Sequence, residues 1–278
     1  MAASANGSGK GARTTRSRRQ QVIVEHVVAD GFASAADLAS LTGVSLMTVH
    51  RDIGELVSRG VLRKYHGGVS AQPSTVFESS SDFRMQVNTD AKAALARAAC
   101  EFISPGMSVM LDDSTTVFEL AKLLPEVGPL TVVTNYRQVT EALREHEDIR
   151  LIGIGGEYSR THDSFIGLPA QEMIAGFSVD VGLQSTSAMT TDMAFHQEQE
   201  IVMVKRAMLR AAAVKVLLMD ASKVGRTALH RFVGVEEFDH VLLSHPEGGE
   251  LDPELVATIA ERTDVRTVTP AAPEHLKR

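Results

Sequence analysis

The sequence predicts an α/β protein in two parts: an N-terminal winged helix-turn-helix joined to a Rossmann-like domain, a mostly parallel sheet with helices on both faces. Two observations predict this division. Within residues 16–72, three short amphipathic helical segments precede a stretch with the composition of a β-hairpin. From about residue 105, short apolar runs alternate with helical segments, and this alternation is typical of a parallel sheet covered on both faces.

Length and composition are those of a globular protein of about two domains. The chain has 278 residues, of which 44% are hydrophobic and 23% charged, and it is long enough to bury a large core. Its single cysteine, Cys100, excludes an intrachain disulfide, as is usual in a reducing cytoplasm. No apolar run reaches the ~18 residues of a membrane helix, and the basic N-terminus lacks the apolar segment of a secretory signal. We therefore expect a soluble cytoplasmic protein with no membrane partner.

The charge is unevenly distributed between the two parts. Residues 1–72 carry nine Lys/Arg and five Asp/Glu, a net charge of +4, whereas the remainder carries 19 and 30, a net charge of −11. A cationic head on an anionic body suits a protein whose smaller part contacts a polyanion. Chance scatter of surface charge is the alternative explanation.

Composition also sets the expected boundaries. Residues 1–15 are rich in Gly, Ser and Ala and are predicted to form a disordered tail. Residues 16–72 form the predicted winged helix-turn-helix, 73–88 a polar, Ser-rich linker, and 89–278 the α/β domain, which opens with a helix over 89–103.

Three helices are predicted before the hairpin. The first spans about 17–29. The second begins at an N-cap, Ser34, buries Leu38 and Leu41, and ends at Gly43. The third is capped by Ser45 and ends at Gly60; its predicted buried stripe consists of Val49, Ile53, Leu56 and Val57. Residues 61–64 are then expected to form the first strand of a short hairpin whose turn is at Gly67-Gly68.

The exposed face of the third helix is unusual because it presents hydrogen-bonding and cationic side chains. In a helix-turn-helix the second helix of the motif enters the major groove, where an arginine can bind guanine bidentately and an apolar side chain can meet a thymine methyl. The hairpin would hold the flanking backbone. A protein–protein adaptor would have the same geometry and is the alternative. The candidate DNA contacts are Arg18, Arg19, Ser45, Met47, Thr48, His50, Arg51, Arg63, Lys64 and His66.

The α/β domain is predicted from six apolar runs that read as strands and the helical segments between them. The strands are expected at 107–111, 130–134, 149–154, 178–183, 214–219 and 240–244. The helices are expected at 115–124, 136–145, 168–176, 197–213 and 253–263.

Polar residues follow several of these strands. In open α/β sheets ligands bind beyond the carboxyl ends of strands, and hydroxyls at a helix start suit an oxyanion. An ordinary helix cap is the alternative. Glycine pairs allow a close approach to a ligand, and a lysine can neutralise a phosphate. The candidate ligand residues are Asp112, Ser114, Thr115, Thr116, Thr134, Asn135, Gly155, Gly156 and Lys223.

The stretch "ADLASLTGVSLMTVHRDIGELVSRGVLRKYHGGVS" resembles the N-terminal domain of the DeoR family of bacterial transcription regulators. The family pattern matches Leu38-Ala39, Val44-Ser45, Thr48–Ile53 and Arg63–Gly68. One departure is His50, which stands where the family usually has the first of two arginines, so the operator sequence stays open.

The second domain resembles the DeoR-family effector domain, which is related to sugar-phosphate isomerases and coenzyme A transferases. The family's loop matches Asp112–Thr116, and its helix Glu and Lys match Glu200 and Lys205. The family's Val-Thr-Asn, Gly-Gly and Asp-x-Ser-Lys motifs match residues 133–135, 155–156 and 220–223. The resemblance implies a phosphorylated sugar or related metabolite as effector. It is weakest over 180–197, where Leu183 and Gln184 replace an aromatic residue and a glycine; an unusual effector and a lost ligand site both fit this departure.

Together these features predict a ligand-responsive regulator, most often a repressor of a carbohydrate operon, that binds a double-stranded operator as a homo-oligomer, either dimer or tetramer. The alternative is a sugar-phosphate isomerase or deaminase with an accessory DNA domain, using Glu200 or Asp113 as base. No acid–base pair of distinctive spacing supports catalysis, and we expect no enzyme activity. The ten histidines show no metal-ligand spacing, so neither a metal nor another cofactor is expected.

Overall fold

The computed structural model describes residues 16, 18–24, 26–27, 30–58, 61–65, 67–70 and 81–270. The chain divides into two compact units, Met1–Val87 and Asn88–Arg278. Within the described part of the chain, no helix combines the length and apolar character needed to cross a membrane.

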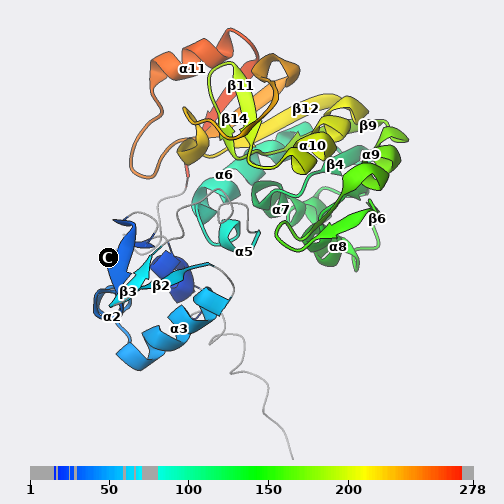
Figure 1. Cartoon of the computed structure of the whole chain (residues 1–278). Coiled ribbons are helices and arrows are strands. Elements are labelled where there is room, and N and C mark those ends of the chain that lie inside the picture. The colour runs from blue at the N-terminus through cyan, green and yellow to red at the C-terminus, as the bar shows by residue number, and fades with distance from the viewer. Residues whose placement is uncertain are drawn as a thin grey trace, which may run out of the picture. The chain divides into compact units, whose positions relative to one another are not determined.

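The N-terminal unit consists of helices and a small antiparallel sheet (Figure 1). The described residues between 16 and 30 are helical. The elements that follow are β1 (Phe32–Ser34), α2 (Ala35–Thr42), α3 (Leu46–Ser58), β2 (Arg63–Tyr65), β3 (Gly68–Ser70) and α5 (Ser81–Arg84). Strands β2 and β3 form the predicted hairpin, while α5 lies in the segment expected to be a linker. Strand β1 was not predicted: it is three residues long and is defined by its pairing with β3, a contact between segments far apart in the sequence.

Helix α2 has both of the predicted ends. The Ser34 hydroxyl accepts a hydrogen bond from the Asp37 backbone N–H, the Asp37 carboxylate accepts one from the Ser34 backbone N–H, and Gly43 closes the helix at φ 66°. Glycine adopts this left-handed conformation without a Cβ clash. The expectation that Leu41 is buried was wrong, since it is 47% exposed. The stripe that packs on the core is Ala35, Leu38 and Ala39, and Leu41 lies beside it.

Helix α3 is amphipathic as predicted. Ser45 caps it by accepting from the Thr48 backbone N–H at 3.3 Å. Val49, Ile53 and Leu56 are buried in the core of the unit, and Val57 packs against that core while partly exposed. The predicted stop, Gly60, lies outside the described residues.

The second unit is built on a seven-stranded sheet in which every neighbouring pair is parallel. The strand order is β15-β14-β12-β9-β4-β5-β6. The strands are β4 (Ser108–Leu111), β5 (Leu130–Thr134), β6 (Ile149–Gly153), β9 (Val179–Gln184), β12 (Ala212–Met219), β14 (His240–Ser244) and β15 (Asp264–Val268). All six predicted strands are present. The seventh, β15, was missed because it is an edge strand whose polar side chains are exposed, so it lacks the apolar run of a buried strand.

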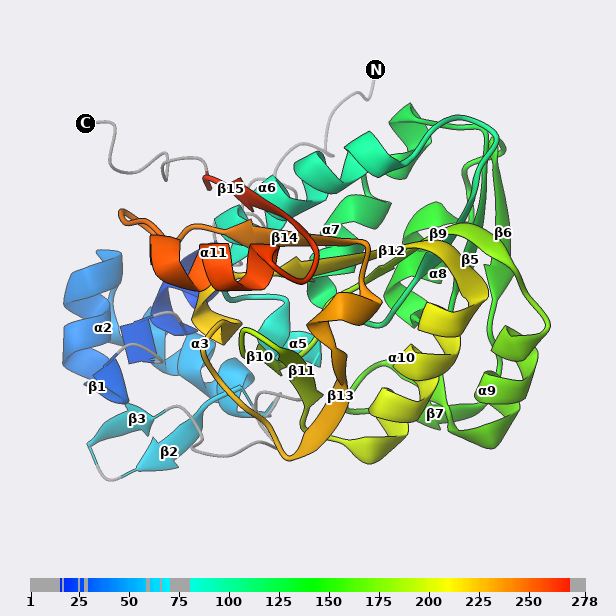
Figure 2. The same ribbon diagram turned by 90° about the horizontal axis from the view of Figure 1, so that it is seen from above.

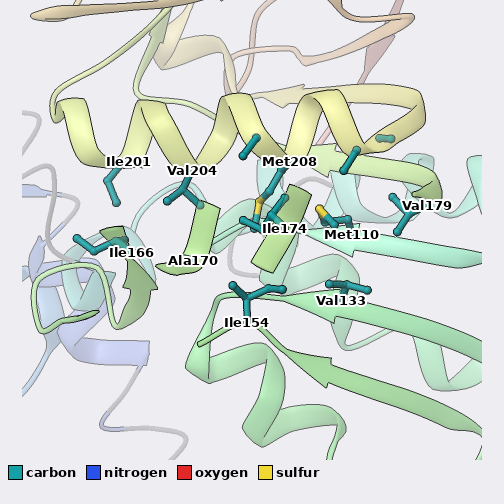
Figure 3. Close-up of a cluster of buried hydrophobic side chains, with 13 residues drawn as sticks. Met110, Val133, Ile154, Ile166, Ala170, Ile174, Val179, Ile201, Val204 and Met208 are labelled. Atoms are coloured by element: carbon teal, nitrogen blue, oxygen red, sulfur yellow. The ribbon is translucent and has the colours of Figure 1, made fainter. Parts of the chain in front are cut away.

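Helices cover both faces of this sheet (Figure 2). One face carries α6 (Thr89–Ala99), α7 (Thr115–Ala121) and α8 (Arg137–Leu143); the other carries α9 (Gly167–Ala175), α10 (Gln199–Ala211) and α11 (Pro253–Ala260). Short 3₁₀ turns occur at Cys100–Phe102, Leu124–Glu126, Ala221–Lys223 and Val235–Glu237. The face under α9 and α10 holds a dense apolar cluster in which Met110 and Val133 of the sheet meet Ile174, Val204 and Met208 of the helices (Figure 3).

Two smaller β elements were not predicted. A three-stranded antiparallel sheet contains β10 (Ala188–Met189), β11 (Met193–His196) and β13 (His230–Gly234), and a hairpin contains β7 (Glu157–Ser159) and β8 (Ser164–Ile166). Most of these strands are only two to four residues long, and they lack the near-continuous apolar runs that identified the strands of the large sheet.

The topology defines a switch point. From β4 the chain proceeds outward to β5 and β6, then returns to the other side of β4 with β9, β12, β14 and β15. In such sheets the crevice at the carboxyl ends of the two central strands is where ligands bind. Here that position lies between β4 and β9.

Candidate functional site

Helix α3 and its cap, Ser45, hold half of the ten side chains expected to contact DNA. Met47 is 75% exposed, and His50, Arg51 and Ser45 are also exposed. Thr48 is half-buried, and its hydroxyl lies 3.0 Å from the Ser45 hydroxyl. The helix thus presents a cation, an imidazole and hydroxyl groups on one side while its apolar stripe is buried.

The hairpin presents two further cations. Arg63 and Lys64 are exposed on β2, and the Arg63 guanidinium lies 5.2 Å from the centre of the Tyr65 ring. This cation–π contact orients the arginine without neutralising its charge. His66 lies outside the described residues.

Arg19 requires a correction. It was expected on the DNA backbone, yet its guanidinium donates to the carboxylate of Asp52 at 2.6 Å and is largely buried. Gln20 donates to the same carboxylate at 3.3 Å. Asp52 is 1% exposed, and a buried carboxylate must be paired, so Arg19 is committed to anchoring the first helix on α3. Arg18 is exposed.

In the second unit, polar residues gather at the carboxyl ends of neighbouring strands. Each of the following is at least nine-tenths buried: Asp112 and Asp113 after β4, Thr134 and Asn135 at the end of β5, Gln184 and Ser185 at the end of β9, and Asp220 after β12. The topology therefore brings together the strand-end residues that the sequence singled out.

Asp112 is the centre of this edge. One carboxylate oxygen accepts from the Ser114 backbone N–H at 3.0 Å, and the other accepts from the Ser185 backbone N–H at 3.0 Å and from the Lys205 ammonium. The Lys205 ammonium also lies 3.2 Å from Asp113, whose second oxygen accepts from the Ser164 hydroxyl at 2.8 Å. All of these groups are buried. Lys205, which the resemblance alone suggested, thus joins α10 to the loop after β4.

The hydroxyls of the loop are also buried. Ser114 caps α7 by accepting from the Val117 N–H at 3.1 Å. Thr115 and Thr116 are 2% and 0% exposed, and the Thr116 hydroxyl has no hydrogen-bond partner among the described residues. These groups do not face solvent in this conformation.

The β7–β8 hairpin covers the end of β5. The Asn135 side-chain amide donates to the Phe165 backbone carbonyl at 2.9 Å, and the Phe165 backbone N–H donates to the Asn135 backbone carbonyl at 2.9 Å. The hydrogen bond from Ser164 to Asp113 continues this contact across to the loop after β4. Access to the buried edge from this side therefore requires the hairpin to move.

Asp163 fastens the hairpin. It has φ 57°, and its carboxylate accepts a bidentate pair from Arg137 at 2.6 and 2.8 Å, with further bonds from Gln138 and Tyr158 at 2.6 Å each. Burial raises the pKa of Asp163, but these hydrogen bonds outweigh burial and hold the pKa below its ordinary value. The same contacts raise the pKa of Arg137 and of the Tyr158 phenol.

A second charged group lies at the end of β12. Asp220 is paired with Lys223 at 3.3 Å, and it accepts from Ser222 and from Asn88, the latter at 3.0 Å. Burial raises the pKa of Asp220, while Lys223, Ser222 and the buried Lys92 of α6 lower it, and the net direction is downward.

Three candidates do not join the buried edge. Glu200 is exposed in the first turn of α10. Gly155 is exposed with open space around it. A Cβ on Gly156 would lie 2.4 Å from the Ile166 carbonyl, so this glycine is required by the chain's own hairpin rather than by a ligand.

Sequence reasoning missed Lys92, Ser164 and the role of Gln184. A lysine at an apolar position of a helix, as Lys92 is, would have been a detectable signal. Ser164 gave none, since its partner lies 51 residues away. Among the described residues, no group of three His, Cys, Asp or Glu side chains is placed to hold a metal.

Two family models match the chain: the DeoR-like helix-turn-helix domain over residues 19–75 and the DeoR C terminal sensor domain over residues 87–245. The chain is 30% identical to a putative aga operon transcriptional repressor of Escherichia coli O157:H7, covering 85% of this chain and 89% of the relative. It is 29% identical to the glycerol-3-phosphate regulon repressor of Escherichia coli strain K12, covering 83% and 92%. A solved D-ribose-5-phosphate isomerase in complex with phospho-erythronic acid aligns over 49% of this chain and 53% of its own, with 17% identity and a TM-score of 0.37.

Proposed function

The chain belongs to the DeoR family of transcription regulators, and from this membership we propose that it is a cytoplasmic repressor of a carbohydrate-metabolism operon, with its operator affinity controlled by a phosphorylated sugar or related metabolite. The observation that carries the proposal is the pairing of a DNA-reading helix with a sensor domain whose polar residues converge at the switch point. The names of the relatives, repressors of an aga operon and of a glycerol-3-phosphate regulon, support carbohydrate control.

The DNA contact follows from the exposed side of α3. With the helix in the major groove, Arg51 would bind a guanine, Met47 would contact a thymine methyl, and the Ser45 hydroxyl would donate to a phosphate oxygen at the helix start. Arg63 and Lys64 extend the contact to the flanking backbone. Because helix-turn-helix proteins read paired half-sites, we expect a two-fold dimer or a tetramer made of two such dimers, which light scattering of the pure protein would test.

The test of the DNA assignment is fluorescence anisotropy with the upstream region of the protein's own gene. Arg51→Ala is expected to weaken specific binding by about 1–3 kcal/mol, while Arg150→Ala, an exposed arginine of β6, serves as the charge-matched control and leaves it unchanged. Affinity should also fall steeply as salt rises, because phosphate contacts release counterions. Equal binding by both variants would refute the groove assignment.

The sensor part of the proposal rests on reciprocity. A metabolite that binds one arrangement of the protein better than the other changes operator affinity by a coupling of about 1–3 kcal/mol. Since the strand-end groups are buried beneath the β7–β8 hairpin, effector entry displaces the hairpin. The measurement is operator affinity with and without each of a panel of sugar phosphates, together with hydrogen exchange of residues 157–166. No change in affinity with any sugar phosphate would refute this part.

The enzyme alternative receives no support from the geometry. Of its two proposed bases, Glu200 is exposed away from the buried edge, and Asp113 is already bound to Lys205 and Ser164. The relatives named above are regulators.

A further inference from the structure

Three polar side chains stand in one row across the switch point. Leu111 pairs with Leu183 on one side and with Thr134 on the other. The next residues along the three strands are therefore level with one another: Gln184, Asp112 and Asn135.

The row faces α10. Met110 and Val133, two positions earlier on β4 and β5, point toward α9 and α10 (Figure 3), and alternate residues of a strand share a face. Gln184 confirms this side, because its amide nitrogen donates to the Lys205 carbonyl of α10 at 2.9 Å.

The central member of the row, Asp112, has little capacity left for a ligand, because three of the roughly four acceptor sites of its carboxylate are filled. Both oxygens of Asp112 already accept hydrogen bonds from the protein, from two backbone N–H groups and the Lys205 ammonium. Further recognition at this level therefore falls mainly to the two flanking amides.

Both amides have a fixed orientation. The Asn135 nitrogen donates to the Phe165 carbonyl and the Gln184 nitrogen to the Lys205 carbonyl. A carbonyl accepts only, so neither amide can be flipped. What remains is Oδ1 of Asn135 and Oε1 of Gln184, two buried acceptors that no described group satisfies. Buried polar atoms are ordinarily paired, and leaving one without a donor is costly.

The chemistry of these two atoms selects the ligand group. An amide oxygen accepts, so its partner must donate. A phosphate dianion offers acceptors alone, and it would also meet two carboxylates, Asp112 and Asp113, against the single ammonium of Lys205. Hydroxyl and amino groups donate and carry no negative charge.

Building on the proposed sensor function, we propose that Gln184 and Asn135 form a subsite that reads hydroxyl or amino groups of the effector and excludes its phosphate. Gln184 is the specificity-determining member, since it supplies an acceptor at the end of β9 immediately beside the switch point. The phosphate of a sugar phosphate then lies away from this row.

The first test needs no variant. Full-length protein is titrated calorimetrically with hexose 6-phosphates and pentose 5-phosphates, and the tightest binder is compared with its monodeoxy and monodeoxyfluoro analogues. Removal of the hydroxyl that contacts the row should weaken binding about tenfold. The fluoro analogue, which keeps an acceptor but cannot donate, should bind as weakly as the deoxy analogue. A fluoro analogue as tight as the parent would overturn the proposal.

The second test assigns the contact to Gln184. Gln184→Met should weaken the parent probe about tenfold and leave the matching deoxy analogue within about twofold, because partners in contact are non-additive. Gln171→Met is the control: it also removes an amide-to-carbonyl hydrogen bond, to Gly167 on α9, and should change neither affinity.

The outcomes separate this proposal from the sensor function. Equal weakening of parent and deoxy probes by Gln184→Met, or tight binding of inorganic phosphate that Gln184→Met abolishes, overturns the subsite while leaving an effector-binding protein. If no member of the panel binds at all, the subsite and the sensor function both fail.

Discussion

The two units hold their functional side chains in opposite environments. On α3 the groups proposed to contact DNA project from an exposed face and are supported by an apolar stripe behind them. At the carboxyl edge of the large sheet the polar groups are buried, bonded to one another and covered by a hairpin. We therefore expect that the exposed face can be altered with little effect on folding, whereas changes at the buried polar edge affect stability as well as the proposed effector recognition.

The largest expected effect is at Lys205. Lys205→Met leaves Asp112 and Asp113 buried without their cation, and breaking a buried ion pair in this way costs about 3–5 kcal/mol. Thermal unfolding of the second unit should therefore shift sharply downward. The control is Lys122→Met, which removes an exposed pair with Glu119 of a kind worth about 0–1 kcal/mol. Equal shifts for the two variants would mean that the buried edge does not contribute to stability.

A smaller effect is expected at Asp52, the one described acidic residue of the N-terminal unit that is fully buried. Asp52→Ala removes the acceptor of Arg19, and a hydrogen bond to a charged group contributes about 1.5–3 kcal/mol. Gln20 keeps its second acceptor, the Glu55 carboxylate, at 3.1 Å. Denaturant unfolding would measure the loss. DNA affinity should fall only through the unfolded fraction, so a loss of affinity in the fully folded variant would place Arg19 at the DNA after all.

Asp163 tests the cover of the buried edge. Its folded pKa lies below the ordinary value of 3.8, so its contribution is present at neutral pH and is lost as the pH falls below about 4 and through that lowered pKa. Asp163→Asn should increase hydrogen exchange in residues 157–166 at pH 7 and should flatten the acid dependence of that exchange. An unchanged profile would show that the hairpin is held by other contacts.

The smallest expected effect is at Met47, which is 75% exposed. Met47→Ala should leave thermal stability unchanged to within about 0.5 kcal/mol, as for other surface changes. Specific operator binding should weaken modestly if Met47 contacts a thymine methyl. A competition assay between the operator and the same operator with uracil in place of thymine measures the methyl contact directly: Met47→Ala should lose the preference for thymine.

Sequence reasoning was most successful where structure follows a local pattern. The stripe of Val49, Ile53 and Leu56 identified α3 and, by exclusion, the face that carries Arg51. It failed where a contact joins distant segments. Leu41 was expected inside, and Arg19 was expected on DNA, because nothing local indicates that Leu41 lies off the packed stripe or that Arg19 meets Asp52, 33 residues along the chain.

The amino-acid sequence by itself determined the two-part organisation, the helix caps at Ser34 and Gly43, and the six apolar strands, because these follow from spacing and propensity within a few residues. The tertiary structure alone decided that Gln184, Asp112 and Asn135 share one row, that Lys205 pairs with both carboxylates of the loop after β4, and that the β7–β8 hairpin bonds to Asn135 and Asp113. Parallel strands meet through long crossovers, so which strand ends become neighbours depends on the packing of the whole domain.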